Sequence, residues 1–490
     1  MSEVRVRYAP SPTGSPHVGN IRTAVFDWLF ARHSGGTFVL RIEDTDKNRE
    51  VAGAIDEQLQ CLSWLGLDYD EGYGKGGEFG PYLQSERLPL YREHVERLIA
   101  EGKAYRAYDT PEELTRMRED QQKRGLPTGY NRRHRYLDPS ERSRYEIERG
   151  DACTVRFAVP LEGRTTVEDA VYGDISVENK LLEDVVLLKS DGFPTYHLAA
   201  IVDDHLMKIS HVLRGEEWIP SAPIHLLLAQ AFGWTPPVFV HLPVMLGPDK
   251  KKFGKRNGAL PALEYKKNGI LAEAMLNFLA LQGWSPKEEK DIYSREDLIE
   301  RFDLDGLINH SPISDPDKLL WYNGQYIRML PVPDLAERTL PFLQERGLIG
   351  DAPNRDELNY IGEVISLEQE RIKVLSEAPD LCSFFFVADD AVEYGSNATS
   401  KWFGHPGVGE RLRLVCEKIA QVHDYTVEGC EHAVRSVIAE TGAKGGEVIH
   451  PVRVAVTGRT TGPGLFEAMH VLGRTRVVNR LNRAISLTTG

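Results

Sequence analysis

Cysteine is scarce in this sequence, and the five cysteines that it has lie far apart. None of them has the Cys-x-x-Cys or mixed Cys/His spacing that gathers the ligands of a zinc ion or forms a redox pair. Five thiols in 490 residues are also too few for the disulfide framework of a secreted protein. We therefore expect no structural zinc or other metal, and a protein that works in a reducing cytoplasm.

Long hydrophobic runs are missing as well. No stretch approaches the ~18 apolar residues of a membrane span, and the first residues lack the basic and apolar parts of a signal peptide. We find no internal repeat and no low-complexity segment, which argues against a solenoid. The sequence predicts a cytoplasmic protein with no membrane partner.

The length of the chain predicts its number of domains, and its net charge bears on the kind of partner that it binds. A chain of 490 residues with 41% hydrophobic side chains is expected to form two to four domains. The 59 Lys and Arg residues against 73 Asp and Glu residues leave a net charge of −14, which disfavours nucleic acid as a partner. Binding depends on charge within a Debye length of roughly 8–10 Å, however, so basic patches have to be sought segment by segment.

The first part of the chain has an α/β pattern. Residues 4–9 and 37–42 read as strands, and each is followed by a segment with helical spacing of apolar residues. This order predicts a doubly wound, Rossmann-like parallel sheet that binds its ligand at the carboxyl ends of its strands. After an irregular insertion the sheet is expected to resume with a strand at 184–188, buried on both faces, and with strands at 211–214 and 242–246. Helical patterns dominate from residue 270 onward.

The tetrapeptide His17-Val18-Gly19-Asn20 lies where the first loop enters the first helix. A helix N-terminus presents unpaired N–H groups and the positive end of the helix dipole, which favours phosphate. Gly19 would let a planar base approach the backbone, and His17 and Asn20 offer donors to phosphate oxygens. The plainer alternative is a helix start that happens to contain glycine and a surface histidine.

A second candidate is the basic loop at 249–258, which follows the last predicted sheet strand. Lysines beside a phosphate site can neutralise the charge that develops on a transferring phosphoryl group. A solvated basic loop is the alternative. The two candidates gain weight together only if both lie at the same edge of the sheet.

Charged residues at strand ends form the third candidate. Arg7, Glu43 and Arg214 each follow or end a predicted strand. Two cations and one anion suit a ligand with two carboxylates and one ammonium, and glutamate is such a ligand. Intrachain salt bridges at the strand ends are the alternative.

Five segments resemble, in chain order, the signatures of the glutamyl-tRNA synthetases, a family of class I aminoacyl-tRNA synthetases. They are RYAPSPTG at 7–14, HVGN at 17–20, RIEDTD at 41–46, SDGFPTYHL at 190–198 and KFGKR at 252–256. Segments 318–328 and 451–473 are similar to the stem-contact and anticodon-binding regions of the same family. The resemblance covers nearly the whole chain.

The resemblance implies a role for each matched residue. The implied catalytic residues, which would steady the ATP triphosphate, are His17, Asn20, Lys252 and Lys255. The implied glutamate-binding residues are Arg7 and Tyr196 on the side-chain carboxylate, Arg214 on the α-carboxylate, Ser11 and Glu43 on the ammonium, and Ala9. The implied ATP-binding residues are Pro10, Gly14, His17, Gly19, Lys252 and Lys255.

The resemblance also implies a domain plan, substrates and partners. The expected domains are 1–82 and 186–245 for the two halves of the catalytic domain, 83–185 for an α+β insertion that binds the tRNA acceptor end, 246–332 for a stem-contact domain, and 333–393 and 394–490 for two all-α anticodon-binding domains. The reaction attaches L-glutamate to tRNA(Glu) through glutamyl-adenylate, with ATP and Mg²⁺. We expect a monomer.

Two positions depart from the family pattern. Gly254 replaces a usual serine, and Ala200 replaces a frequent asparagine, so each removes a hydrogen-bonding side chain near the substrates. These departures leave room for a duplicated synthetase with altered tRNA choice. Two further alternatives have to be weighed. One is a shorter paralogue that attaches glutamate to a modified tRNA base, but such proteins lack the C-terminal helical domains and commonly carry zinc. The other is a non-catalytic tRNA-binding paralogue, against which the intact His17 and Lys252 speak.

Contacts with tRNA must come from local basic groups. Arg476, Arg480 and Arg483 share one face of an expected C-terminal helix, which suits a phosphate track, with a solvated basic face as the alternative. Arg371 resembles an arginine that the family uses near the third anticodon base. Because one arginine contact to a base edge is worth ~1–3 kcal/mol, this residue could separate tRNA(Glu) from tRNA(Gln).

Overall fold

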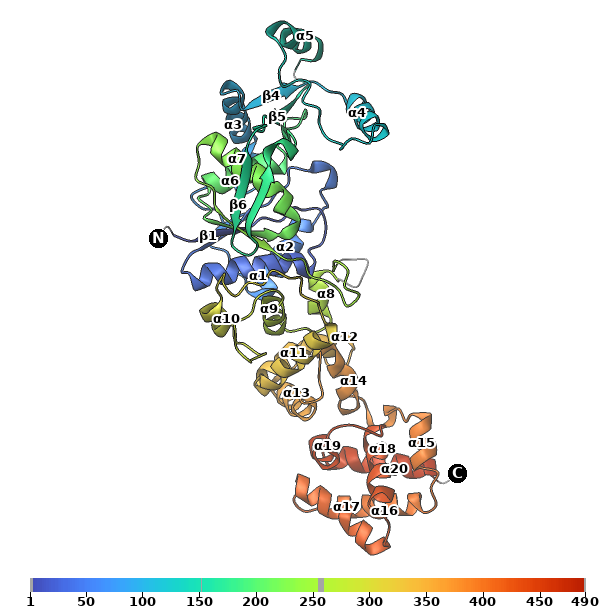
Figure 1. Ribbon diagram of the computed structural model, residues 1–490. Coiled ribbons are helices and arrows are strands. Elements are labelled where there is room, and N and C mark those ends of the chain that lie inside the picture. The colour runs from blue at the N-terminus through green and yellow to red at the C-terminus, as the bar shows by residue number, and fades with distance from the viewer. Residues whose placement is uncertain (1–2, 151, 254–259, 489–490) are drawn as a thin grey trace. The chain divides into compact units, whose positions relative to one another are not determined.

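The computed structural model describes residues 3–150, 152–253 and 260–488. The chain forms two compact units, Met1–Lys266 with Met275–Pro316 and Lys267–Ala274 with Asp317–Gly490. Within the described residues, every strand lies in the first unit, and the elements of the second are all helices (Figure 1). This confirms the expected change from α/β to all-α, whereas the finer domain boundaries stay predictions.

Two groups of parallel strands build the main sheet of the first unit. The first group is β1 (Arg5–Tyr8), β2 (Thr37–Leu40) and β3 (Glu71–Gly72), and the second is β9 (His211–Gly215), β10 (Val238–Leu242) and β6 (Arg164–Asp169). The groups meet where β1 lies beside β9, since Ser210 N donates to Arg5 O at 2.9 Å. The Rossmann-like sheet is thus confirmed, and its two central strands end side by side, where such sheets bind ligands.

β1 is buried along its whole length although every second residue is an arginine. Arg5 pairs with Glu71, and Arg7 pairs with Asp204, so both charges are compensated inside the unit. The helix that follows, α1 (Val18–His33), is also buried on most of its surface. The first loop therefore connects two elements that are both anchored in the interior.

The predicted strand at 184–188 does not belong to the parallel sheet. The segment forms β8 (Val186–Leu188), which pairs antiparallel with β5 (Thr154–Phe157), and β5 pairs antiparallel with β4 (Ala104–Ala107). Only Leu187 of β8 is fully buried, so the expectation of two buried faces was also wrong. A short apolar run identifies a strand but not its partner.

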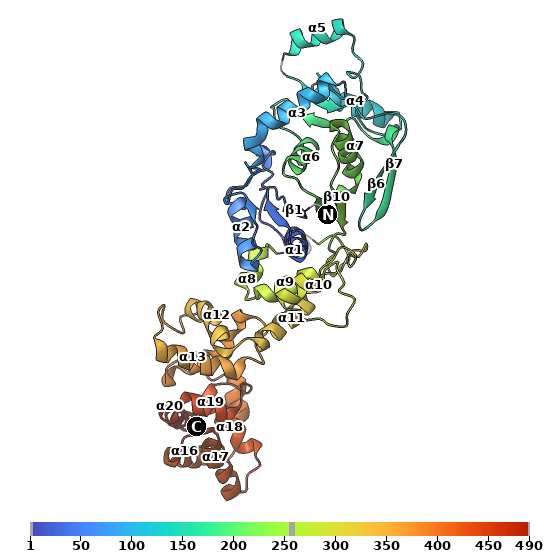
Figure 2. The ribbon, with the colours of Figure 1, turned by 90° about the vertical axis from the view of Figure 1, so that its left-hand side faces the viewer.

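The last predicted strand also lies elsewhere along the chain. The expected strand at 242–246 is β10, which ends at Leu242 because Pro243 has no N–H group to continue the ladder. On the far side of β10, β6 and β7 (Gly173–Glu178) form an antiparallel hairpin from inside the predicted insertion (Figure 2). Part of that segment therefore extends the catalytic sheet.

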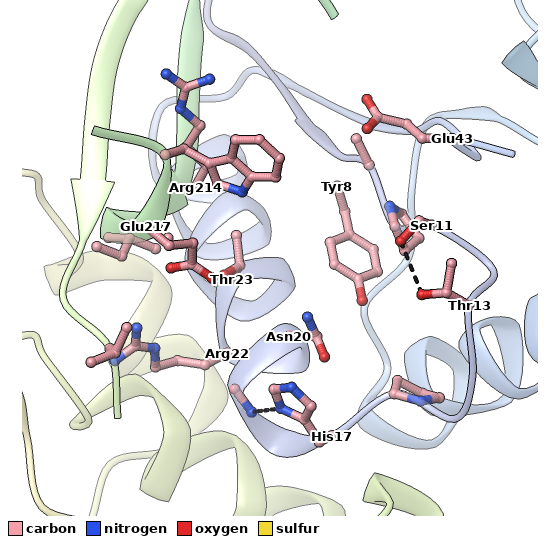
Figure 3. Close-up of a pocket in the computed structure, with 18 of the residues that line it drawn as sticks. Tyr8, Ser11, Thr13, His17, Asn20, Arg22, Thr23, Glu43, Arg214 and Glu217 are labelled. Carbon is pink, nitrogen blue, oxygen red and sulfur yellow. Dashed lines mark hydrogen bonds between the residues drawn. The ribbon is translucent and has the colours of Figure 1, made fainter. Parts of the chain in front are cut away.

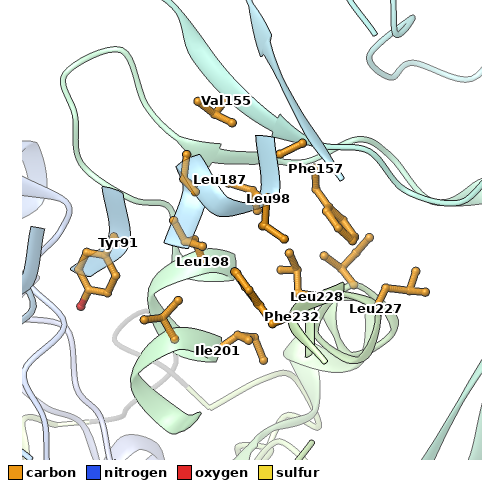
Figure 4. Close-up of a cluster of buried hydrophobic side chains, with 14 of the residues drawn as sticks. Tyr91, Leu98, Val155, Phe157, Leu187, Leu198, Ile201, Leu227, Leu228 and Phe232 are labelled. Carbon is orange, nitrogen blue, oxygen red and sulfur yellow. The ribbon is translucent and has the colours of Figure 1, made fainter. Parts of the chain in front are cut away.

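A hydrophobic core joins the small antiparallel sheet to three helices, as Figure 4 shows. The helices are α3 (Leu88–Ala100), α6 (Tyr196–Leu206) and α7 (Ala222–Phe232). Leu98, Phe157, Leu198 and Leu228 are among its fully buried members. The start of α6, which carries Tyr196, is anchored in this core.

The second unit has the following helices of five or more residues: α11 (Pro316–Met329), α12 (Val332–Glu345), α13 (Arg355–Glu368), α14 (Ala378–Cys382), α15 (Ser396–Trp402), α16 (Val408–Gln421), α17 (Val427–Thr441), α18 (Gly446–Thr457), α19 (Leu465–Leu472) and α20 (Arg474–Thr488). α16 packs against α17, α18 and α20. In the part of the chain that is described, no helix has the length and apolar character that crossing a membrane requires.

Candidate active site

A cavity of about 480 Å³ opens at the carboxyl ends of β1, β9 and β10 (Figure 3). The predicted catalytic and substrate-binding residues that line it are Arg7, Ala9, Pro10, Ser11, Gly14, His17, Gly19, Asn20, Glu43, Tyr196, Arg214 and Lys252. Lys255 and Gly254 lie outside the described residues. Segments that are far apart in the chain thus meet at one edge of the sheet, as the topology required.

His17 caps the N-terminus of α1. Its ring Nδ1 accepts a hydrogen bond from Gly19 N at 3.1 Å (Figure 3), so the neutral ring carries its proton on Nε2. A Cβ atom at Gly19 would lie only 3.0 Å from His17 Cε1, so glycine leaves room for the ring. Asn20 follows in the exposed first turn and also lines the cavity. The helix start thus brings two polar side chains, His17 and Asn20, to the cavity wall, while the N–H groups of Gly19 and Asn20 bond to His17 itself.

Lys252 reaches the cavity from a tight hairpin after β10. Phe253 N donates to Met245 O at 2.8 Å, which closes the hairpin, and Phe253 is buried in the cavity wall. Lys252 Nζ lies 3.5 Å from Glu217 Oε1, with both side chains about half exposed. Beyond the undescribed residues, Pro261 forms a β-bridge with His17. The described ends of the basic loop therefore flank the helix start.

Arg7 and Glu43 are fixed by ion pairs in the interior of the unit. Arg7 donates from Nε to Asp204 Oδ1 at 3.0 Å and from Nη1 to Leu213 O at 3.2 Å. Arg41 donates to the same Asp204 oxygen at 2.8 Å and to Glu43 Oε1 at 2.9 Å. The salt bridges that were the alternative interpretation are thus present. Because Arg7 and Glu43 also line the cavity, the ion pairs orient them there.

Arg214, at the end of β9, is held in a different way. Its Nε donates to His241 Nε2 at 3.0 Å, and its Nη1 lies 2.9 Å from His225 Nδ1 and 3.3 Å from Tyr196 OH. Its Nη2 is buried and has no hydrogen-bond partner in the structure. A buried guanidinium nitrogen without an acceptor, in the wall of a cavity, is suited to a ligand carboxylate.

Several lining residues were not assigned from the sequence, among them Arg22, Glu217 and Trp218. Arg22 lies on α1, donates to Gln282 O at 3.0 Å and keeps a buried Nε without a partner. Burial lowers the pKa of Arg22 to about 10, against the raising effect of Glu217. Trp218 packs on the Tyr196 ring with centroids 4.1 Å apart. An arginine inside an apolar helix is a signal that could have identified Arg22.

The three arginines expected to contact tRNA phosphates share one face of α20, but that face points inward. Arg480 is fully buried and donates to Asp389 Oδ1 at 3.0 Å and to Val456 O at 2.8 Å. Arg476 donates to Val387 O at 2.6 Å, and Arg483 donates to Val392 O at 2.7 Å. These contacts disfavour an exposed phosphate track on this face, because Arg480 is buried and the partly buried Arg476 and Arg483 bond to main-chain carbonyls.

Arg371 lies just after α13, and its side chain is 37% exposed. Its Nη1 donates to Glu368 Oε2 at 2.5 Å, and Glu368 is fully buried. Burial raises the pKa of Glu368, while the neighbouring Arg371 lowers it, and the net pKa lies above its usual value. The partly exposed guanidinium can still offer donors to a base edge.

Comparisons with known proteins agree with this architecture. The family model described as "tRNA synthetases class I (E and Q), catalytic domain" matches residues 3–321, and the model "Anticodon binding domain" matches residues 334–485. A glutamate–tRNA ligase of Moorella thermoacetica is 46% identical over 99% of this chain and 98% of its own, and one of Dehalococcoides mccartyi is 47% identical over the same shares.

Among solved structures, a glutamate tRNA ligase from Elizabethkingia meningosepticum, crystallised in complex with its amino acid, superposes with a TM-score of 0.91. It is 34% identical and covers 99% of both chains. A Rossmann-like sheet within a match to the class I catalytic domain, followed by a helical part that matches an anticodon-binding domain, defines a class I aminoacyl-tRNA synthetase. Within that class, the chain belongs to the glutamate–tRNA ligase family. The full-length matches also argue against the shorter paralogue.

Proposed function

We propose that this enzyme attaches L-glutamate to tRNA(Glu) in two steps, both at the described cavity. Glutamate and ATP first give glutamyl-adenylate and pyrophosphate, and a ribose hydroxyl of the 3′-terminal adenosine then takes the acyl group. The observation that carries this proposal is the meeting of Arg7, Arg214 and Glu43 with His17 and Lys252 around one cavity.

The charges of the cavity match glutamate. Arg7 takes the side-chain carboxylate together with the Tyr196 hydroxyl, and Arg214 takes the α-carboxylate through its unpartnered Nη2. Glu43, oriented by Arg41, and Ser11 take the ammonium. Guanidinium groups pair with carboxylates in a bidentate geometry, which adds geometric selectivity to the attraction.

The start of α1 and the basic hairpin suit the triphosphate of ATP. The helix N-terminus offers the positive end of the helix dipole, and the His17 imidazole and Asn20 amide add donors. Lys252 lines the same cavity, and we assign Lys255 to the same task. These donors act most strongly as charge builds up on the α-phosphate and the leaving pyrophosphate.

Mg²⁺ enters this proposal together with ATP. The described residues contain no group of three or more His, Cys, Asp or Glu side chains suited to hold a metal ion. Mg²⁺ commonly binds through substrate phosphates and waters with one or two carboxylates, so the phosphates would supply most of its ligands. The bound ion would neutralise phosphate charge, and Glu217, which lines the cavity and lies 3.5 Å from Lys252 Nζ, is a carboxylate that could contribute a ligand.

The side chains do no covalent chemistry in either step. An α-carboxylate oxygen bonds to the α-phosphorus while the bond to the bridging oxygen breaks and pyrophosphate leaves. The ribose oxygen then bonds to the acyl carbon, its proton is released, and AMP leaves. The enzyme accelerates these steps by positioning the reactants and stabilising charge.

Replacing Arg7 by lysine is expected to raise the KM for glutamate by about 10- to 100-fold, because a hydrogen bond to a charged group is worth about 1.5–3 kcal/mol. Lysine keeps the charge but lacks the planar guanidinium group, which can donate hydrogen bonds to Asp204, the Leu213 carbonyl and a ligand carboxylate at the same time. Steady-state aminoacylation at saturating ATP and tRNA measures the effect. The control is Arg32→Lys. Arg32 lies on α1 and forms a partly exposed ion pair with Asp70. An unchanged glutamate KM in the Arg7 variant would show that Arg7 does not bind glutamate.

Arg371 is our candidate for reading the anticodon, and it sets the choice between tRNA(Glu) and tRNA(Gln). Its guanidinium is partly exposed and held at one end by Glu368. Charging of each tRNA by the purified enzyme, compared with charging by Arg371→Gln, tests this role. If the ratio of tRNA(Glu) charging to tRNA(Gln) charging is the same in both enzymes, Arg371 takes no part in anticodon recognition.

A further inference from the structure

Of the two arginines that we assign to glutamate, Arg214 is the one whose hydrogen-bond partners, within the described residues, are all neutral. Arg7 pairs with Asp204 at 3.0 Å, so part of its charge is compensated inside the protein. In the described part of the chain, Arg214 makes no ion pair with a carboxylate. It donates instead to imidazole nitrogens of His241 and His225. Arg214 thus keeps its full charge for a ligand while its orientation is fixed.

This arrangement works only if each histidine offers an unprotonated nitrogen to Arg214. His241 is the cross-strand neighbour of Arg214, on β10, and its Nδ1 lies 2.6 Å from Asp169 Oδ2. A carboxylate oxygen only accepts, so the Nδ1 proton is donated to Asp169 and Nε2 is left as the acceptor for Arg214 Nε–H. Asp169 therefore selects the tautomer of His241.

Asp169 is itself held firmly at the end of β6. Its Oδ1 accepts from Val171 N at 3.0 Å and Tyr172 N at 2.9 Å, and its Oδ2 also accepts from His241 N at 3.2 Å. Burial raises the pKa of Asp169, but the hydrogen bonds from His241 and Tyr172 outweigh it, so the net pKa lies below its usual value. The carboxylate stays charged and its oxygens stay acceptors.

The hydrogen bond between Arg214 and His225 also needs an unprotonated histidine nitrogen. His225, on α7, accepts from Arg214 at Nδ1, so its proton lies on Nε2, which is 3.2 Å from His197 Nδ1. Burial, followed by the charge of Arg214, lowers the pKa of His197 to about 4 and holds that of His225 well below its usual value. Both rings are neutral near pH 7, so they orient Arg214 without adding positive charge beside it.

We propose that Asp169 and His241 are positioning residues for glutamate binding, and that they act by presenting the unprotonated Nε2 of His241 to Arg214. This inference rests on the proposed role of Arg214 as the α-carboxylate ligand. The β6–β7 hairpin, which comes from the inserted segment, thereby contributes a side chain that acts on the amino acid site. Its contribution is transmitted by the proton position on a single imidazole.

The test is the substitution Asp169→Asn. The asparagine carbonyl is drawn to the Val171 and Tyr172 N–H groups, which need an acceptor, so the NH₂ group faces His241 Nδ1. The His241 proton then moves to Nε2 and meets the N–H of Arg214, donor against donor. We expect the glutamate KM to rise at least tenfold while the ATP KM changes less than twofold, in aminoacylation with saturating tRNA.

The second variant is His241→Gln, and the effect of Asp169→Asn is measured again in its presence. Its amide oxygen can accept from Arg214, and an amide has no tautomer for Asp169 to select. We therefore expect His241→Gln alone to stay within a few-fold of the wild-type glutamate KM, and Asp169→Asn to have little further effect in that background. His241→Phe, which keeps the ring and removes the acceptor, should resemble Asp169→Asn.

The outcomes separate this inference from the proposed function. If Arg214→Gln leaves the glutamate KM unchanged, Arg214 is not the carboxylate ligand and both fail. If Arg214→Gln raises it but Asp169→Asn does not, the positioning role alone is wrong. An effect of Asp169→Asn that persists undiminished in His241→Gln, or that raises the ATP and glutamate KM values equally, would show general structural damage instead. Thermal unfolding of each variant measures such damage directly.

Discussion

Replacement of His17 by alanine is expected to lower the rate of glutamate activation by about 10²- to 10³-fold, the usual effect of removing one preorganised donor to developing charge. His17 lies at the N-terminus of α1, on the cavity wall, and its neutral ring carries its proton on Nε2. Substrate KM values should change much less than kcat, because the donor acts mainly in the transition state. ATP–pyrophosphate exchange in the presence of tRNA measures the rate.

His17 also caps a helix, so the two roles have to be separated. His17→Asn keeps a side chain that can accept from Gly19 N, since asparagine is a good N-cap, but it removes the imidazole. We expect this variant to fold like the wild type and still lose activity. His33→Ala, at the exposed end of the same helix, is the control. Full activity in His17→Asn would mean that His17 only starts the helix.

Replacement of Lys255 by alanine should depress adenylate formation by at least about 10²-fold, because its ammonium would neutralise charge on the leaving pyrophosphate. Lys255 itself lies outside the described residues. The assignment rests on the family resemblance and on the flanking Phe253 and Pro261, which lie at the cavity wall and beside His17. Affinity for tRNA should be unchanged, as measured by filter binding.

Lys250→Asn is the matched control for this loop. It removes a positive charge from the same hairpin, and asparagine tolerates the left-handed backbone that Lys250 adopts at φ +59°. Activation should fall little in this variant. Equal losses of adenylate formation and tRNA binding in Lys255→Ala would contradict a catalytic role and indicate a general electrostatic one.

The location of the candidate site was predictable from the sequence because its groups follow local signals. Loops at the carboxyl ends of parallel strands meet at one edge, so His17, Asn20 and Lys252 were expected together, and all three line the cavity. The charged residues that we assign to glutamate also lie at strand ends. The residues that orient these charges, such as Asp204, which accepts a hydrogen bond from Arg7, come from segments that no local sequence pattern connects.

Other features depended on tertiary context. The segment 184–188 is a strand as expected, but its partner β5 is chosen by the fold of the insertion. Sequence alone does not say which way the Arg480 face of α20 points, and in the fold it faces carbonyls of α18 and of the segment around Val387. Likewise, Asp169 and His241 are 72 residues apart, and only the parallel pairing of β6 with β10 brings them together.

The central claim is that the cavity activates glutamate with ATP. ATP–pyrophosphate exchange by the purified enzyme, with tRNA(Glu) present and with glutamate, glutamine or aspartate as the amino acid, tests it most directly. We predict exchange with glutamate, stimulated by tRNA, and far less with glutamine, whose neutral amide leaves one guanidinium without its carboxylate. Absence of exchange with glutamate, or equal exchange with glutamine, would contradict the account.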